Sequence, residues 1–233
     1  MPGAVNVQWQ QLTLTDSADA TIAQWRGAME EKLGALGIAP DDDVVVYDDG
    51  SLWAARVWWV LRQLGQQTVQ VLDGGKPAWE AAGHSLSAEA PAPSAVSYTA
   101  TPDQSSLITA DELRDKLGSD DLALVDARTA EEFAGRDNSG AKRPGHIPGA
   151  VNIPYTLTAR AEQPRTFLPP PELLALYATR GVVPGKEVVA YCSTGVRSAV
   201  TYFSLLLLGF PRVRLYSPSY AEWGNRDDLP VEL

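Results

Sequence analysis

The chain contains an internal repeat, and this repeat restricts the possible fold more than any other feature of the sequence. Residues 37–47 resemble residues 181–191 at a shift of 144 positions. Near that shift the match extends over about 80 residues, with Pro2 to Val7 opposite Pro148 to Ile153, Gly65 opposite Gly209, Val69 opposite Val213 and Trp79 opposite Trp223. A near-constant shift over this length indicates two copies of one fold rather than a solenoid of small repeats.

The two copies differ at their starts. Upstream of Pro148, residues 122–126 are typical of a buried strand and residues 129–133 of a short helix, and the first copy has no counterpart to either. Because Met1 falls opposite Ile147, we expect the first copy to be truncated at its N-terminus, either through numbering from an internal methionine or through shortening. The alternative is that the first copy closes its sheet with fewer strands.

The joint between the copies is marked by composition. Residues 81–106 are rich in Ala, Pro, Ser and Thr and show no strong period, and the stretch 90–94 is typical of a stiff, hydrophilic connector. We therefore predict an abbreviated first domain over residues 1–85, a linker over 86–105 and a second domain over 106–233.

Apolar segments with β-forming residues alternate with helical segments, which favours an α/β fold. Parallel strands that are buried on both faces are typically apolar throughout, so we predict two domains, each with a parallel sheet flanked by helices. The predicted strands are 44–47, 69–72, 122–126, 150–153, 187–191 and 212–216, and the predicted helices are 18–36, 54–64, 110–117, 129–133, 171–180, 197–208 and 219–224.

Composition excludes several classes of protein. The formal net charge of −10 argues against a nucleic-acid or anionic-membrane surface, although it permits a small anionic substrate in a local site of opposite charge. No apolar run approaches the roughly 20 residues that span a bilayer, and the start does not resemble a signal peptide. A single cysteine provides no intrachain disulfide, so we expect a cytoplasmic protein.

That cysteine, Cys192, opens a six-residue loop between a predicted strand and a predicted helix, and Arg197 closes the loop. Ligand sites in open α/β sheets lie beyond the carboxyl ends of strands. Gly195 allows several backbone N–H groups to face one point, and Arg197 adds a positive charge. We expect a reactive thiolate at Cys192 rather than an inert buried thiol, with an anionic substrate held by the rest of the loop: Ser193, Thr194, Gly195, Val196 and Arg197.

The first copy lacks this chemistry. At the shift of 144 positions, Asp48 stands opposite Cys192 and Trp53 stands opposite Arg197. A carboxylate is neither a soft nucleophile nor an anion receptor, so we expect the first domain to be catalytically silent and to act as a packing partner.

Several motifs resemble the rhodanese family of sulfurtransferases in its tandem two-domain form, and the likeness covers nearly the whole chain. They are Val125-Asp126-Ala127-Arg128 with Glu131-Glu132-Phe133, then Arg143-Pro144-Gly145-His146-Ile147-Pro148-Gly149-Ala150, and Val71-Leu72-Asp73-Gly74-Gly75 with Trp79. The resemblance implies that Cys192 takes a sulfane sulfur from a donor such as thiosulfate and passes it from a persulfide to cyanide or a thiol. It implies no metal or cofactor, and the oligomeric state stays open.

The chain also departs from the family pattern. Ser193 follows the cysteine, which leaves 3-mercaptopyruvate open as the donor, although the closing Arg197 is more typical of thiosulfate enzymes. Glu132 stands where some members carry a substrate-binding arginine, so we expect Arg143 to provide that contact, with Arg136 and Lys142 as weaker candidates. Pro218 replaces a residue of the usual turn near the C-terminus, and we expect an altered turn there.

Other readings remain open. Cysteine phosphatases also close a cysteine loop with arginine, but the related ones use a loop one residue longer, and a non-catalytic sulfur-carrier or binding module is a further alternative. We expect His146 to be structural, and we expect Trp53, Trp58, Trp59 and Trp79 to pack in the core and between the domains. Asp126 and Arg128 either shape the field of the pocket or form a buried ion pair.

Overall fold

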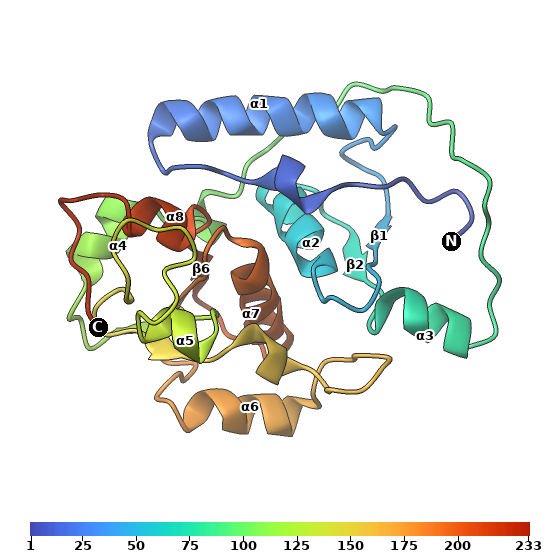
Figure 1. Cartoon of the computed structure of the whole chain (residues 1–233). Coiled ribbons are helices and arrows are strands. Elements are labelled where there is room, and N and C mark those ends of the chain that lie inside the picture. The colour runs from blue at the N-terminus through green and yellow to red at the C-terminus, as the bar shows by residue number, and fades with distance from the viewer.

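The computed structural model describes residues 1–233 and contains two parallel sheets surrounded by helices (Figure 1). In chain order the elements are the 3₁₀ helix η1 (Trp9–Leu12), α1 (Asp19–Ala35), β1 (Val44–Val46), α2 (Ala54–Gln63), β2 (Val69–Val71), α3 (Gly75–Ala81), η2 (Gln104–Ser106), α4 (Ala110–Lys116), β3 (Leu122–Asp126), α5 (Ala130–Phe133), β4 (Val151–Asn152), η3 (Tyr155–Thr158), α6 (Pro170–Ala178), β5 (Glu187–Tyr191), α7 (Val196–Leu207), β6 (Val213–Leu215) and α8 (Ser219–Trp223). Every predicted strand and helix is present, with ends that differ by at most a few residues.

The second sheet has four strands in the order β4-β3-β5-β6, and all of its pairs are parallel. Its central strand β5 is apolar on both faces. Val188 and Ala190 belong to one core cluster, with α6 and α7, while Val189 and Tyr191 belong to another, with α4 and α8. A strand buried on both faces explains why residues 187–191 show no polar alternation.

The first sheet has two strands, β1 and β2, which pair in parallel in the register Val44 to Val69. At the shift of 144 positions these strands correspond to β5 and β6 of the second sheet, so the repeat is present in the structure as well as in the sequence. Counterparts of β3 and β4 do not occur in the first sheet.

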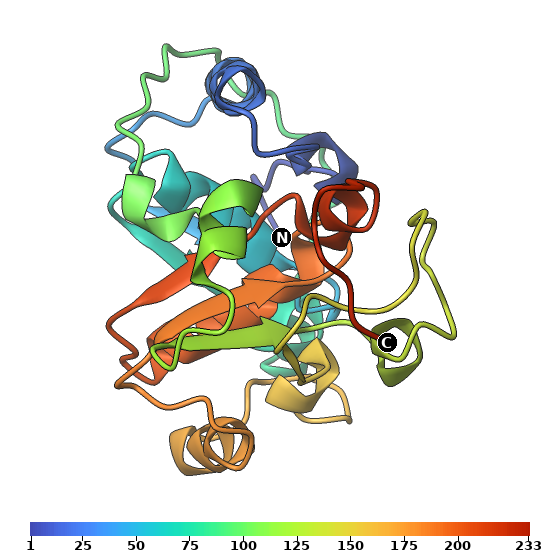
Figure 2. The same cartoon turned by 90° about the vertical axis from the view of Figure 1, so that its left-hand side faces the viewer.

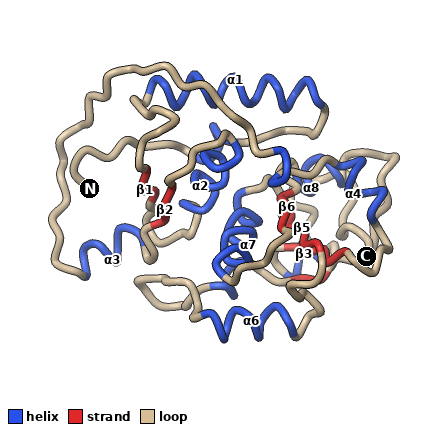
Figure 3. The backbone as a smooth tube through the Cα atoms, turned by 180° about the vertical axis from the view of Figure 1, so that it is seen from behind, coloured by secondary structure: helices blue, strands red, loops and turns tan.

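The two halves pack through α2 and α7, the helices that follow the two corresponding loops. Both helices lie between the two sheets when the molecule is seen from the front or from behind (Figures 1 and 3). The ring centre of Trp58 on α2 lies 6.3 Å from that of Tyr202 and 4.9 Å from that of Phe203. Trp59 is fully buried in the largest core cluster. Trp58 and Trp59 therefore pack between the halves and in the core, as predicted, whereas Trp79 lies outside the core clusters, with its ring centre 4.4 Å from that of His84.

The segment between the halves has no helix or strand from α3 to η2. Figure 1 shows it as a long strand-free connection that passes around the outside of the first half. Most of its residues are exposed, but Tyr98 is buried and its hydroxyl donates to Gln66 at 3.1 Å. None of the helices is long and apolar enough to span a bilayer.

Candidate active site

Cys192 lies directly after β5, at the carboxyl end of the second sheet, and its loop leads into α7. Figure 2 shows the strands of this sheet side by side. Gly195 precedes α7 in a left-handed conformation with φ of +82°. A Cβ atom at this position would lie 2.4 Å from the backbone oxygen of Ser217, so the loop accepts only glycine there. This tight turn directs the loop amides inward.

The sulfur of Cys192 faces these donors. The Gly195 N–H donates to Sγ at 3.2 Å, and the Ser198 hydroxyl donates to Sγ at 3.4 Å. The residue is only 1% exposed, so solvent is shut out while the amides remain turned toward the sulfur. The thiol is therefore buried in a polar cradle and not in an apolar interior.

This cradle favours the thiolate. Burial works to raise the pKa of the Cys192 thiol, but the charge of Arg197 and hydrogen bonds from Ser198 and Thr194 outweigh burial and lower the pKa below its ordinary value. Since the thiolate is the reactive form of cysteine, the geometry suits a nucleophile.

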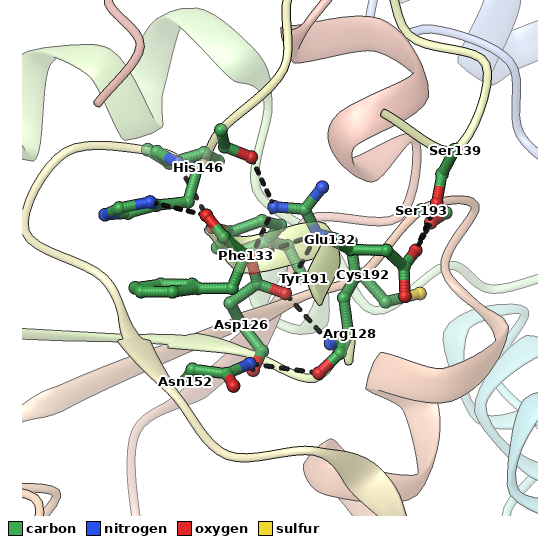
Figure 4. A network of polar contacts seen from close by, with 12 residues as sticks. Asp126, Arg128, Glu132, Phe133, Ser139, His146, Asn152, Tyr191, Cys192 and Ser193 are labelled. Carbon is green, nitrogen blue, oxygen red and sulfur yellow. Dashed lines mark hydrogen bonds and ion pairs between the residues drawn. The ribbon is translucent and has the colours of Figure 1, made fainter. Parts of the chain in front are cut away.

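Arg197 is already paired with a carboxylate. Its guanidinium donates two parallel bonds to Glu132 on α5, both at 2.7 Å, and a third to the Ser193 hydroxyl at 2.6 Å. Ser139 also donates to Glu132. Figure 4 shows the Glu132 carboxylate on the same side as the Cys192 sulfur, beside Ser193 and Ser139. A donor anion therefore meets an arginine whose charge is partly neutralised.

Glu132 is held in its ionised form. Burial works to raise the pKa of Glu132, but hydrogen bonds from Arg197, Ser139 and the Thr129 amide hold that pKa well below its usual range. From the sequence we noted only that Glu132 stands where some family members carry a substrate-binding arginine. The signal for its role was the capping box from Thr129 to Glu132, which places the carboxylate at the start of α5.

The outer face of the loop is fixed by the start of α8. The Tyr220 and Ala221 amides donate to the carbonyl oxygens of Cys192 and Ser193, each at 2.9 Å. The Ser219 hydroxyl accepts from the Cys192 amide at 3.1 Å. Ser219 adopts a left-handed conformation with φ of +60° directly after Pro218, so the turn there is a tight one that holds the cysteine loop.

One residue near the loop was not expected from the sequence. Arg56 on α2 extends from the first half and donates to the Ser217 hydroxyl at 3.0 Å and to the Gly195 carbonyl at 3.5 Å. It is fully buried. Its sequence neighbourhood is that of an ordinary apolar helix, so only the packing of the two halves reveals its position.

Arg143 does not join this cluster. Its guanidinium donates to backbone oxygens of the C-terminal segment, at Leu229 (2.7 Å), Trp223 (2.9 Å) and Arg226. The expectation that Arg143 binds the donor therefore has to be corrected, because these bonds direct its charge toward the C-terminal segment and attach that segment to the Gly-His turn. Arg136 pairs with Glu131 and Lys142 with Asp227, all of them exposed.

The Asp126–Arg128 pair is a buried structural network. Both side chains are fully buried, and Arg128 donates to Asp126 at 2.6 Å and to the Gly145 carbonyl at 2.8 Å (Figure 4). His146 stacks on Phe133 with ring centres 3.7 Å apart, and its Nδ1 lies 2.9 Å from the Phe133 carbonyl oxygen. Neither His146 nor Asp126 hydrogen bonds to Cys192.

The corresponding loop of the first half is filled by its own side chain. The Asp48 carboxylate accepts from the Gly50 amide and from the Ala54 amide, both at 2.7 Å. At the shift of 144 positions Gly50 and Ala54 correspond to Thr194 and Ser198, whose amides help to lower the pKa of the Cys192 thiol. The aspartate therefore occupies the amides that have this role in the second half. Trp53 packs edge-on against Trp9, with ring centres 5.8 Å apart.

A cavity of about 940 Å³ lies in the first half and not at Cys192. It is bounded by the N-terminal segment, β1 and the Asp48 loop. No three His, Cys, Asp or Glu side chains lie close enough together to hold a metal ion.

This chain resembles known sulfurtransferases and a family of rhodanese-like domains. The chain matches the rhodanese-like domain family over residues 1–82 and 109–226. It is 38% identical to a thiosulfate sulfurtransferase of Azotobacter vinelandii, covering 100% of this chain and 85% of that protein. It is also 41% identical to a probable 3-mercaptopyruvate sulfurtransferase of Pseudomonas aeruginosa, covering 86% of this chain and 71% of that protein.

Solved structures of EanB share the architecture. Wild-type EanB matches with a TM-score of 0.86 at 26% identity, and the whole chain spans 59% of that protein. A variant of EanB that carries a cysteine persulfide and is bound to ergothioneine matches with a TM-score of 0.88 at 25% identity.

The fold and the cysteine cradle together define a two-domain α/β protein with an activated thiol at a strand end. With most of its length matched, the chain belongs to the rhodanese family.

Proposed function

We propose that this chain is a thiosulfate sulfurtransferase that carries sulfur as a persulfide on Cys192. The observation that supports the proposal most strongly is the contact set of Sγ: the Gly195 amide and the Ser198 hydroxyl donate to it, beside the charge of Arg197. A thiolate so placed is a soft nucleophile for a sulfane sulfur.

In the first step, the Cys192 thiolate attacks the outer sulfur of thiosulfate. The new S–S bond forms as the sulfur–sulfur bond of thiosulfate breaks, and the bonding pair leaves with sulfite. The products are a cysteine persulfide anion and sulfite, so charge and atoms balance. The inward amides and Arg197 stabilise the negative charge that moves onto the outer sulfur.

In the second step, cyanide or a thiolate attacks the outer sulfur of the persulfide. The S–S bond to Cys192 breaks, its electron pair returns to the Cys192 sulfur, and thiocyanate or a new persulfide leaves. Because the enzyme alternates between thiolate and persulfide, we expect ping-pong kinetics.

We assign the roles in the site as follows. Cys192 is the nucleophile, and the loop from Ser193 to Arg197 holds the donor, without Arg143. The first half, residues 1–85, is catalytically silent because Asp48 fills its loop, and residues 86–105 link it to the catalytic half, residues 106–233. A cytoplasmic location suits a lone reactive thiol, which needs a reducing compartment.

The test is incubation of the purified protein with thiosulfate, 3-mercaptopyruvate and a phosphomonoester in separate reactions, followed by intact-mass measurement. We expect thiosulfate to add one sulfur atom to Cys192 and cyanide to remove it as thiocyanate. An adduct with 3-mercaptopyruvate but not with thiosulfate supports the second candidate, which the 41% identical Pseudomonas aeruginosa relative favours. Phosphate release, or no adduct with any donor, contradicts the proposal.

A paired substitution separates the charge of Arg197 from its structural contribution. Arg197→Gln is expected to lower kcat/KM for thiosulfate by about 100-fold, since a donor to the developing charge is lost. It also leaves Glu132, with a side chain only 5% exposed, buried without a cation, and so lowers the melting temperature.

The control is the double variant Glu132→Gln with Arg197→Gln, which removes both charges at once. We expect the double variant to regain much of the lost melting temperature but none of the lost activity. If the double variant regains activity as well as melting temperature, Arg197 acts only by holding the loop in place. Measurements of kcat/KM and melting temperature on the three proteins decide between these outcomes.

A further inference from the structure

One buried cation in the molecule has no carboxylate partner. Arg56 is fully buried, and its guanidinium donates only to neutral acceptors: the Leu12 carbonyl at 2.6 Å, the Ser217 hydroxyl at 3.0 Å and the Gly195 carbonyl at 3.5 Å. Its Nε–H has no acceptor. Buried charges are normally paired with an opposite charge. We therefore expect an anionic group close to Arg56.

Two of these acceptors belong to the wall of the active site. The Gly195 amide donates to the Cys192 sulfur, and the carbonyl of the same residue accepts from Arg56. A Cβ atom at Gly195 would lie 3.1 Å from the Arg56 guanidinium and 2.4 Å from the Ser217 carbonyl. The arginine and the sulfur are thus linked through a single, tightly packed loop residue.

The charges around Arg56 indicate that the Cys192 thiolate is the nearby anion. Arg197 on α7 faces Cys192, but Glu132 on α5 neutralises it through two hydrogen bonds. Burial lowers the pKa of Arg56 to about 10, and the negative charge of Cys192 opposes that change. Apart from burial, Arg197 has the largest effect on the pKa of the Cys192 thiol. Arg56 is a further positive charge beside the loop, and no carboxylate pairs with it.

We propose that Arg56, supplied by the catalytically silent half, is a positioning residue for the active site of the other half. It holds the Gly195 carbonyl so that the loop amides face Cys192, and its unpaired charge stabilises the thiolate and the persulfide anion. The effect of Arg56 on catalysis depends on the proposed function being correct. Arg56 also gives the silent half a chemical role, because α2 supplies this second positive charge.

The test follows the ionisation of Cys192, the only cysteine in the chain, through the pH dependence of its alkylation by iodoacetamide. Arg56→Met removes the charge and keeps most of the length of the side chain. We expect the apparent pKa of the thiol to rise by about one pH unit in Arg56→Met. Arg56→Lys keeps a positive charge at this position, so we expect its thiol pKa to lie close to that of the unaltered protein. Circular dichroism establishes that each variant is folded.

A matched control lies on the same helix. Arg62 also donates to backbone carbonyls, those of Gln66 and Gln67 at 3.0 and 2.7 Å, but it makes no contact with the cysteine loop. Arg62→Met is expected to leave the alkylation profile unchanged. An unchanged profile in folded Arg56→Met overturns the proposal.

Where Arg56→Met does not fold, Arg56→Lys decides alone. A thiol pKa close to that of the unaltered protein supports the charge role, and a rise of about one pH unit despite the retained charge overturns it. Alkylation needs no sulfur donor and no acceptor. Its result therefore stands whether or not the mass experiment finds a sulfur adduct, and the two proposals fail separately.

Discussion

Replacement of Cys192 by serine is expected to lower sulfur transfer by roughly four orders of magnitude or more, to the level of the uncatalysed reaction. The serine hydroxyl fits the same cradle, but it does not ionise near neutral pH and forms no persulfide. Since the Cys192 amide and carbonyl are bound to Ser219 and Tyr220, the loop keeps its shape. Steady-state assays with thiosulfate and cyanide measure the loss.

Ser198→Ala provides the matched control for this change. It keeps the thiol and removes one hydrogen bond to Sγ, the one at 3.4 Å. We expect a decrease in rate of about tenfold, in line with the loss of one hydrogen bond to a charged group. Sulfur transfer retained by the folded serine variant of Cys192 would remove that residue from the mechanism.

Replacement of Asp126 by asparagine is expected to have the largest effect on stability. Asp126 and Arg128 are both fully buried, and their contacts extend to Gly145 and to the ring of Tyr220, 4.0 Å from the guanidinium carbon. Asparagine has nearly the same shape but leaves the Arg128 charge buried without an anion. We expect a loss of about 3 kcal/mol in the free energy of unfolding, which lowers the melting temperature by about 10 °C.

The control for this prediction is Asp121→Asn, which breaks an ion pair with Arg212 on the exposed end of the second sheet. Pairs that are open to solvent contribute little, so this variant should melt close to the unaltered protein. Urea unfolding of both variants measures the difference. Equal, small effects at the two positions would mean that the buried pair contributes no more than the exposed one.

The fold was readable from the sequence because its signals are local. The shift of 144 positions predicted two copies, and β1, β2, β5 and β6 align in the structure at that same shift. Apolar runs without alternation predicted parallel strands buried on both faces, and β5 is such a strand. The helix predicted over residues 171–180 is α6, which begins at Pro170.

The cysteine loop was also predictable, and for the same reason. Cys192, Gly195 and Arg197 lie within six residues between a strand and a helix, so the direction of the loop follows from the chain itself. The contrast with Asp48 was visible in the same way, although its two bonds to the Gly50 and Ala54 amides are findings of the structure.

Three further features depended on contacts between distant residues. Glu132 and Arg197 are 65 positions apart, and Arg56 and Gly195 are 139 positions apart. Arg143 reaches the carbonyl of Leu229 across 86 positions, and this removed it from the proposed donor site. Nothing in the local sequence distinguishes an arginine that binds backbone carbonyls from one that faces a substrate.

The local sequence was enough to predict the duplicated α/β fold, a reactive Cys192 and a catalytically silent first half, because periodicity, turn geometry and loop order act over a few neighbouring residues. The charges that lie near Cys192 are set by contacts between residues far apart in the chain. The packing of α2 against α7 brings Arg56 to the loop, and the capping box of α5 turns Glu132 toward Arg197. Electrostatic balance in a buried site depends on distances between groups, and those distances exist only after the two halves have packed together.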